Sequence, residues 1–180
     1  EVYYAEALEG KRRVLGDEHP STLWSIGKMG DLLSEQGKYV EAEVYAREAL
    51  EGNRRVLGDE HPSTLWSIGN MGHLLFMQGK YDEAEPHFVE ALAIQRNILG
   101  NEHPSTQGSV NNMGVLLSDH RKFDEAEVYY AEALEGKRRV LGDERPSTLW
   151  SIGTIGDLLS LHGNDDDAEQ HAGQRRAASP

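Results

Sequence analysis

A period of 42 residues governs almost the whole chain. The letters LGDEHPSTLWSIG at 15–27 recur unchanged at 57–69 and return at 141–153 with one substitution. The chain divides into blocks at 1–42, 43–84, 85–126 and 127–168, and the first block differs from the second at only 8 positions. Self-similarity at a period of about 20–50 residues is typical of stacked repeat arrays. We therefore expect an elongated stack of small units without a single central core.

Each block carries the signals of two helices. In the second block, Gly58 follows an apolar pair and Pro62 follows four residues later, and these residue types are typical of a helix end and a helix start. Apolar residues then recur on one helix face until Gly79, and a second helix begins near Tyr81. No stretch alternates apolar and polar residues, so no strands are expected. In first-block numbers the two helices span about 20–36 and 39–57.

The order of small and apolar residues resembles the tetratricopeptide repeat. In the first block this order is carried by Met29, Gly30, Leu33, Gly37, Lys38, Tyr39, Ala42, Ala49 and Leu50. The repeat length is similar to the subtype of kinesin light chains and nephrocystin-3-like proteins, whose Asn-Asn pair recurs at Asn111 and Asn112. The resemblance spans residues 1 to about 172. It implies an all-α, right-handed α-solenoid of antiparallel helix pairs.

The repeats predict one array with defined boundaries. An orphan second helix at 1–18 precedes repeats at 19–60, 61–102 and 103–144, a fourth repeat at 145–176 and a tail at 177–180. The last helix of the fourth repeat is degenerate, because Ala172 replaces an aromatic residue and Arg175 and Arg176 replace Ala-Leu. Since the chain starts in mid-block without methionine, we expect it to be a piece of a longer array.

Charge and composition exclude several classes of protein. Lys and Arg number 18 against 31 Asp and Glu, a net charge of −13, so we expect no nucleic-acid or membrane partner. The absence of cysteine excludes disulfides and thiolate chemistry and fits a reducing compartment, so we expect a cytoplasmic protein. No apolar run approaches the roughly 18 residues of a membrane span, and the start does not resemble a signal peptide.

The recurring polar residues do not form a catalytic or metal-binding pattern. The stretch from Gly72 to Tyr81 has six residues between its glycines, whereas a phosphate-binding loop has about four. His19, His61 and His103 stand before helix-starting prolines, and equivalent points two helices apart are roughly 20 Å apart. The carboxylates converge on no base or nucleophile. We predict a non-enzymatic protein that uses no cofactor and no metal.

Basic residues gather near the ends of the second helices, at 11–13, 54–55, 96 and 137–139. Cations at a helix C-terminus offset the helix dipole, which is a structural explanation for this pattern. Docking of an acidic partner along the same edge is the alternative.

In a tetratricopeptide stack, the first helix of each pair lines the concave surface. The stripe that contains Leu23, Ile26 and Leu33 must face the second helix, so residues offset from it face the groove. We expect the peptide-binding groove to consist of Trp24, Lys28, Asp31, Trp66, Asn70, His73, Phe76, Met77, Asn111, Asn112, Val115, Trp150 and Asp157.

The three tryptophans allow two interpretations. Each indole seals the contact between neighbouring repeats, or each anchors a bound peptide, as aromatic residues do in binding hot spots. In the second case Gly27, Gly69 and Gly153 offer bare backbone to a ligand. In the third block Gly108 replaces the tryptophan, which would open a notch beside the Asn-Asn pair. The asparagine amides there would pair with a peptide backbone.

We therefore predict an interaction scaffold that binds a partner protein or peptide in its groove. The groove positions lack the converging lysine and asparagine of chaperone-tail clamps. The kinesin light chain resemblance implies acidic, tryptophan-bearing cargo, but Asp31, Glu35, Asp119 and Asp157 would repel it. A neutral, basic or aromatic-poor segment fits better. The alternative function is a structural spacer or a self-associating array whose terminal helices stack on further repeats.

Overall fold

The chain folds into α-helices joined by short turns. The structure, a computed structural model, describes the backbone of residues 2–177 and the side chains as far as Gly163. The helices are α1 (Val2–Leu15), α2 (Pro20–Glu35), α3 (Tyr39–Leu57), α4 (Pro62–Met77), α5 (Tyr81–Leu99), α6 (Pro104–Asp119), α7 (Phe123–Leu141) and α8 (Pro146–Ala177). The described backbone contains no strand. The predicted helices of the first block agree with α2 and α3.

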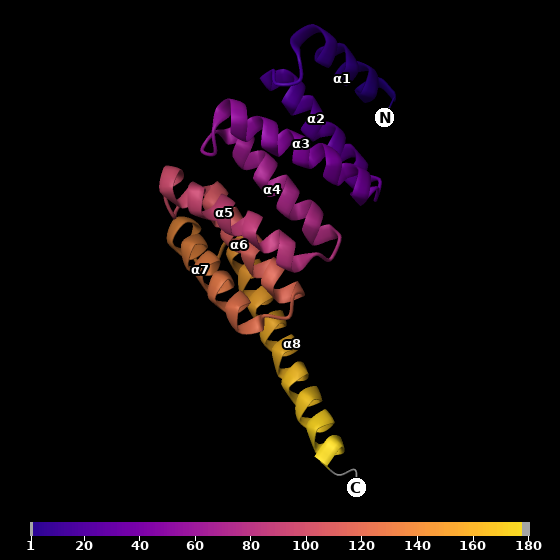
Figure 1. The fold of residues 1–180 in the computed structure, drawn as a ribbon. Helices are drawn as coiled ribbons and strands as arrows, with labels where there is room; N and C mark the ends of the chain where they lie inside the picture. The colour runs from indigo at the N-terminus through magenta and orange to yellow at the C-terminus, as the bar shows by residue number, and fades with distance from the viewer. Residues whose placement is uncertain (1, 178–180) are drawn as a thin grey trace. The chain divides into compact units, whose positions relative to one another are not determined.

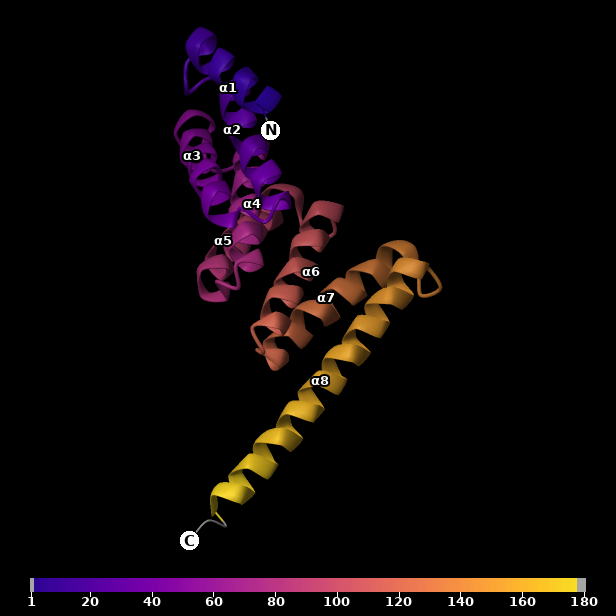
Figure 2. The same cartoon turned by 90° about the vertical axis from the view of Figure 1, so that its right-hand side faces the viewer.

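The helices divide into two units, Glu1–Gly100 and Asn101–Pro180, which are called unit 1 and unit 2 below. In unit 1, α1 to α5 pack in chain order, and each helix runs antiparallel to the one before it (Figure 1). In unit 2, α7 packs against both α6 and α8 (Figure 2). The prediction of an all-α fold built from antiparallel helix pairs is confirmed.

Each first helix begins at the linker proline, and in α2, α4 and α6 the histidine before this proline caps the helix. The Nδ1 atom of His19 accepts a hydrogen bond from the backbone N–H of Ser21 at 3.1 Å. His61 and His103 cap α4 and α6 in the same way. A side-chain acceptor here satisfies one of the backbone donors that a helix start leaves unpaired. The linker histidines are therefore helix caps.

The first helix of each of the first three repeats ends at a residue in the left-handed backbone conformation. Gly37 has φ +75°, and the following N–H of Lys38 bonds to the carbonyl of Leu33 at 2.9 Å. This turn brings the second helix back against the first. In the third block Arg121 adopts the same conformation at φ 62°, although it is not glycine.

Glycines in the middle of the first helices let the paired helices approach closely. A Cβ on Gly30 would lie 3.3 Å from the backbone oxygen of Ala42, and one on Gly114 would lie 2.8 Å from the ring of Tyr130. Gly72 is similarly close to α5. A glycine costs about 1 kcal/mol in a helix interior, and the close packing explains why it is nevertheless present here.

The fourth block differs from the predicted helix pair. α8 is one continuous helix that extends beyond the helices it packs against (Figure 2). Gly163, the equivalent of Gly37, is helical instead of left-handed. In the third block Phe123 starts α7 and is buried, whereas the fourth block has Asp165 at this position and cannot anchor a second helix in the same way. The side chains of the degenerate segment (164–177) and all of 178–180, the rest of the predicted tail, lie outside the described residues.

The core of each helix pair lies between its first and second helix. Leu23 packs on Gly52 and is only 2 % exposed. In the second repeat (61–102) Ile94 replaces that glycine, and Leu65 is half-buried. Leu99 is exposed, because it is the last residue of α5.

Candidate functional site

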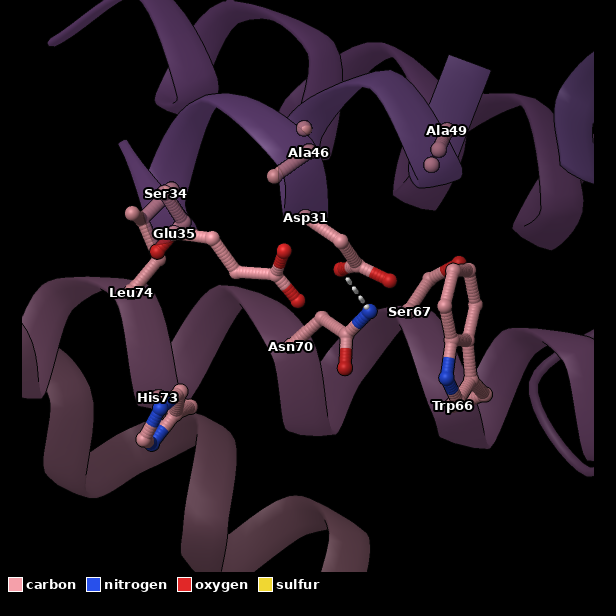
Figure 3. Close-up of a pocket in the computed structure, with 12 residues that line it drawn as sticks. Asp31, Ser34, Glu35, Ala46, Ala49, Trp66, Ser67, Asn70, His73 and Leu74 are labelled. Atoms are coloured by element: carbon pink, nitrogen blue, oxygen red, sulfur yellow. Dashed lines mark hydrogen bonds between the residues drawn. The ribbon is translucent and has the colours of Figure 1, made fainter. Parts of the chain in front are cut away.

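The predicted groove residues of unit 1 form a small pocket between α2 and α4. Its volume is about 220 Å³, and Asp31, Trp66, Asn70 and His73 line it together with small residues of α3. Figure 3 shows Asp31 and Asn70 pointing toward each other, and the Asn70 amide donates a hydrogen bond to Asp31 at 2.7 Å. Lys28 forms an ion pair with the other oxygen of Asp31 at 2.9 Å. The main cation of this groove is therefore already paired within the protein.

The indole of Trp66 lies over the backbone of Gly27 on the neighbouring α2. A Cβ on Gly27 would lie 2.5 Å from the ring, so only glycine leaves room for it. The indole is half-buried, and Lys28 Nζ lies 4.8 Å from its centre, within range of a cation–π interaction. Trp66 thus seals the contact between the first two repeats. Gly27 is covered, and is not the bare backbone that the peptide-anchor interpretation expected.

Trp24 is in a different position. Its indole is 52 % exposed, and the Nζ atoms of Lys11 and Lys28 lie 5.5 and 5.9 Å from the ring centre. A shallow pocket of about 280 Å³ lies between Trp24 and Trp66. One face of this tryptophan is therefore open to solvent at the edge of the groove.

Unit 2 has a larger cavity at the equivalent place. Its volume is about 480 Å³, and Gly108 stands where Trp24 stands in unit 1. Nothing lies within 4 Å of a Cβ on Gly108, so the missing ring is not replaced by another side chain among the described residues. Asn111, Asn112 and Trp150 line this cavity, and α7 contributes an apolar floor. The notch expected at Gly108 is present in unit 2.

Trp150 stays at the edge of this cavity. Asn111 occupies the position equivalent to Gly27, so the bare backbone on which Trp66 lies is missing for Trp150, which is 60 % exposed. Lys137 Nζ lies 5.4 Å from the indole centre and donates a hydrogen bond to Ser151 Oγ at 2.6 Å. Burial lowers the pKa of Lys137. The cavity therefore combines an open indole, two amides and an amine that is partly shielded from water.

The remaining predicted site residues do not line these cavities. Phe76 is half-buried, with its ring centre 5.8 Å from that of Tyr81, and Met77 is exposed beside it. Val115 is half-buried on α6, and Asp157 is exposed on α8. The structure thus brings together four of the predicted residues in the unit 1 pocket and three in the unit 2 cavity.

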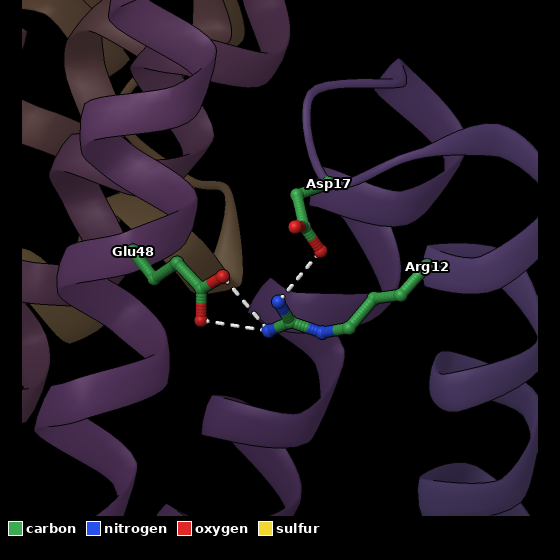
Figure 4. A network of polar contacts seen from close by, with 3 residues as sticks. All are labelled: Arg12, Asp17 and Glu48. Atoms are coloured by element: carbon green, nitrogen blue, oxygen red, sulfur yellow. Dashed lines mark hydrogen bonds and ion pairs between the residues drawn. The ribbon is translucent and has the colours of Figure 1, made fainter.

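Several arginines at the ends of the second helices form ion pairs within the protein. Arg12 donates hydrogen bonds to Glu48 at 2.8 and 2.9 Å and to Asp17 at 2.8 Å (Figure 4). Arg54 pairs with Glu90 of the next second helix in the same manner. Because each pair joins successive repeats, these arginines are cross-links of the stack. These contacts support the structural explanation and not an acidic docking edge.

A polar bridge that was not predicted from the sequence joins neighbouring repeats. Lys11 Nζ donates a hydrogen bond to the buried Ser25 Oγ at 2.7 Å, and Asn53 does the same to Ser67 at 2.9 Å. Lys137 and Ser151 form the equivalent bridge in unit 2. The signal was present in the sequence, since each serine follows its lysine or asparagine by 14 residues and recurs with the period.

Among the described residues, no three histidine or carboxylate side chains lie together in a way that could hold a metal ion. The described helices likewise include none whose length and apolar character would suit it to cross a bilayer.

Solved tetratricopeptide structures share this fold. The nearly identical TPR-like repeats of a putative kinesin light chain from Podosopora anserina match with a TM-score of 0.81, and so does a single-substitution variant of the same repeats. Both are 24 % identical to this chain and are matched over 97 % of it and 82 % of their own length. BtubC (BKLC) from P. vanneervenii has a TM-score of 0.71 and 26 % identity over 89 % of this chain and 65 % of its own. No curated protein matches by sequence.

Family membership follows from the sequence profile of the tetratricopeptide repeat, which matches residues 1–55, 29–97, 63–107 and 105–179. These matches together extend over nearly the whole chain. The solved relatives confirm the predicted solenoid class and the likeness to kinesin light chain repeats. The chain therefore belongs to the tetratricopeptide repeat family.

Proposed function

We propose that this chain is a non-enzymatic scaffold that binds an extended segment of a partner protein along the groove of its first helices. The tetratricopeptide family supports a role in protein interaction in general. The particular groove, its residues and a cytoplasmic setting are the finer parts of the proposal.

The unit 2 cavity carries the proposal. The first, second and fourth blocks are nearly identical, whereas the third has Gly108 in place of their tryptophan and Asn111 in place of the glycine that follows it by three residues. The loss of the tryptophan ring enlarges this space, which measures about 480 Å³ against about 280 Å³ in unit 1, and Asn111 adds an amide to its lining. Concave, largely apolar spaces with a few polar groups are the usual form of a binding site.

The polar groups at this cavity suit a peptide backbone. Asn111 and Asn112 carry amides that both donate and accept hydrogen bonds, so they can pair with a backbone N–H and C=O whatever the side chains of the ligand are. The open face of Trp150 adds an apolar contact of the kind that dominates binding hot spots. Together they favour an extended segment over a globular surface.

The charge of the groove supports a neutral or basic segment. Glu35, Asp119 and Asp157 are exposed on the first helices. Lys28 is held by Asp31, so it does not offset their charge. The net charge of the chain, −13, adds a long-range attraction for basic ligands and a repulsion of acidic ones. Acidic cargo peptides are therefore disfavoured.

A peptide array tests this proposal. The unmodified chain is expected to bind a set of neutral or basic peptides, and Trp150→Ala is expected to weaken the set at least about tenfold. Trp66→Ala is the matched control, since that indole seals the contact between two repeats in unit 1. It should lower the free energy of unfolding and change the set of bound peptides little. An unchanged set of bound peptides with Trp150→Ala would contradict the role of the unit 2 cavity.

A further inference from the structure

The pocket between α2 and α4 in unit 1 differs in size and chemistry from the unit 2 cavity. Its volume of about 220 Å³ lies below the range of about 300–1,000 Å³ that is usual for drug-sized ligands, so it suits a single side chain. The small residues Gly27, Gly30, Ala46 and Ala49 line it together with the indole of Trp66. One long side chain of a ligand can therefore enter between the two first helices.

Two carboxylates line this pocket. Figure 3 shows the side chains of Asp31 and Glu35 extending from α2 into the same space, with Trp66 at one end and His73 at the other. Asp31 already has an ion pair and a hydrogen bond. Glu35 is exposed and forms neither within the part of the chain that the structure describes. The carboxylate of Glu35 therefore remains available to a ligand.

The polar atoms of the pocket are mainly hydrogen-bond acceptors. An ionised carboxylate has about four acceptor sites, so Asp31 can accept further bonds. The Asn70 amide already donates to Asp31, and its carbonyl oxygen is another acceptor. The amine of Lys28 lies over the Trp66 indole, but Lys28 lines the neighbouring pocket and not this one. A ligand that matches this set of atoms brings several donors and a positive charge.

The position of Glu35 adds to the negative potential of the pocket. It is the last residue of α2, and the C-terminal end of a helix carries roughly half a negative charge. The net charge of the chain, −13, acts in the same direction at long range. The local carboxylates, the helix end and the whole chain thus all favour a cation.

The repeats themselves distinguish this pocket from its surroundings. The sequences of α2 and α4 are identical except at four positions. Five of the eight residues at these positions line the pocket, namely Asp31, Ser34, Glu35, Asn70 and His73. In the second repeat, His73 and Met77 replace the two carboxylates. The differences between two otherwise identical helices are therefore concentrated at one pocket, and packing of the repeats does not require this.

We propose that this pocket binds an arginine side chain of the partner segment. The guanidinium packs against the indole of Trp66 and donates hydrogen bonds to Glu35 and Asp31. A guanidinium has five N–H donors and no acceptor, and its planar shape suits both an aromatic ring and a carboxylate. The inference rests on the proposed function only in taking the ligand to be part of a protein, since the unit 2 cavity is a separate site.

Titration with the blocked tripeptide acetyl-Gly-Arg-Gly-amide tests the proposal without a partner protein. The chain has three tryptophans, and the spectrum of Trp66→Phe identifies the indole N–H signal of Trp66 in a ¹H–¹⁵N correlation experiment. We expect this signal to shift in a saturable manner as the tripeptide is added. A Trp66 signal that does not respond to the tripeptide would overturn the proposal.

Glu35→Gln is the decisive variant, because it removes the charge and keeps the size of the side chain. It should weaken binding of the tripeptide about fivefold, as expected for loss of a partly exposed ion pair. Its unfolding midpoint should not change, since Glu35 has no partner among the described residues. Glu51→Gln is the matched control, at an exposed glutamate of α3 that does not line the pocket, and should bind normally. Equal weakening by both variants would indicate general attraction to an acidic protein and would overturn the proposal.

Two further tripeptides define the ligand. Citrulline in place of arginine keeps the planar shape but has no charge and gains an acceptor oxygen, so this peptide should bind at least about fivefold more weakly. Lysine keeps the charge but lacks the planar fork of donors, so its peptide should also bind more weakly than the arginine peptide. Binding of either peptide as tight as that of the arginine peptide would contradict the assignment to a guanidinium.

The two sites can be tested separately. Trp150→Ala removes an indole from the unit 2 cavity and should leave the tripeptide titration unchanged. Failure of the proposed function would appear on the peptide array with Trp150→Ala, whereas failure of the arginine pocket would appear in the tripeptide titration with Glu35→Gln. Weaker binding of the tripeptide to Trp150→Ala would place the arginine in unit 2 and contradict the assignment to the unit 1 pocket.

Discussion

Trp66 lies on the backbone of Gly27, one repeat earlier in the stack, and a Cβ at Gly27 would come within 2.5 Å of the indole ring. This pair accounts for the tryptophan of the second block and for the glycine of the first. The tryptophan of one repeat is seated by the glycine of the preceding repeat. Where the third block changes the glycine to Asn111, Trp150 has no such seat and is 60 % exposed.

The contact between Gly27 and the Trp66 indole can be tested with Gly27→Asn. We expect this change to displace Trp66 and to lower the free energy of unfolding by about 1–3 kcal/mol, because the seam is already closely packed. In a background with Trp24→Phe and Trp150→Phe, the emission of Trp66 should shift to longer wavelength. Gly69→Asn is the control, since Gly69 is the equivalent residue of α4 and has nothing within 4 Å. Equal loss of stability in both variants would show that Gly27 has no special role.

The helix caps predict a stabilising change at the start of α8. His19, His61 and His103 each accept a hydrogen bond from a backbone N–H, but the fourth block has Arg145, which has no acceptor. We expect Arg145→Asp to raise the free energy of unfolding by about 0.5–2 kcal/mol. His61→Ala should lower it by a similar amount. Urea unfolding followed by circular dichroism measures both, and an Arg145→Asp chain no more stable than the original would contradict the cap.

The ionisation of Glu43 makes the stability of the fold depend on pH. A hydrogen bond from Lys80 lowers the pKa of Glu43 below its ordinary value, and bonds from Gln78 and Arg47 act in the same direction. A carboxyl group with a lowered folded-state pKa stabilises the fold above its unfolded-state pKa, and this contribution disappears as the pH falls through the lower value. We therefore expect Glu43→Gln to be less stable than the unmodified chain at neutral pH, by about 1 kcal/mol. The difference should vanish once the pH has fallen below the folded-state pKa, and a difference that is constant with pH would contradict this explanation.

The ion pairs between second helices should contribute little each. Arg54 and Glu90 are 37 % and 35 % exposed, so solvent and salt screen their attraction. A double-mutant cycle with Arg54→Ala and Glu90→Ala should give a coupling energy of about 1 kcal/mol or less. Raising the salt concentration should reduce it further. A coupling that is insensitive to salt would mean that the pair acts through packing and not through charge.

Much of the fold could be predicted from the sequence because its signals are local and repeated. Prolines and glycines mark the helix ends, and the 42-residue period places the equivalent residues of every block. The fourth block shows the limit of this reasoning. A separate second helix there was expected from the period, but that prediction took no account of the missing anchor, since Asp165 stands where Phe123 starts α7.

The candidate site was harder to predict because it depends on contacts between blocks. The notch at Gly108 followed from one missing side chain, and the cavity is present. Periodicity could not tell whether each tryptophan was free or seated, since that depends on a glycine of the preceding repeat, as Trp66 shows. The bridge from Lys11 to Ser25 was missed for the same reason, because both residues appear ordinary on their own helices.

The most direct test of the proposed groove is calorimetric titration of a peptide selected on the array into the unmodified chain and into Gly108→Trp. This substitution restores the residue of the other blocks and fills the unit 2 cavity, without removing any side chain that packs the core. We predict that it weakens peptide binding at least about tenfold, a loss of about 1.4 kcal/mol or more, while the unfolding midpoint stays the same or rises. Binding of equal affinity to both proteins would contradict the claim that this cavity holds the partner segment.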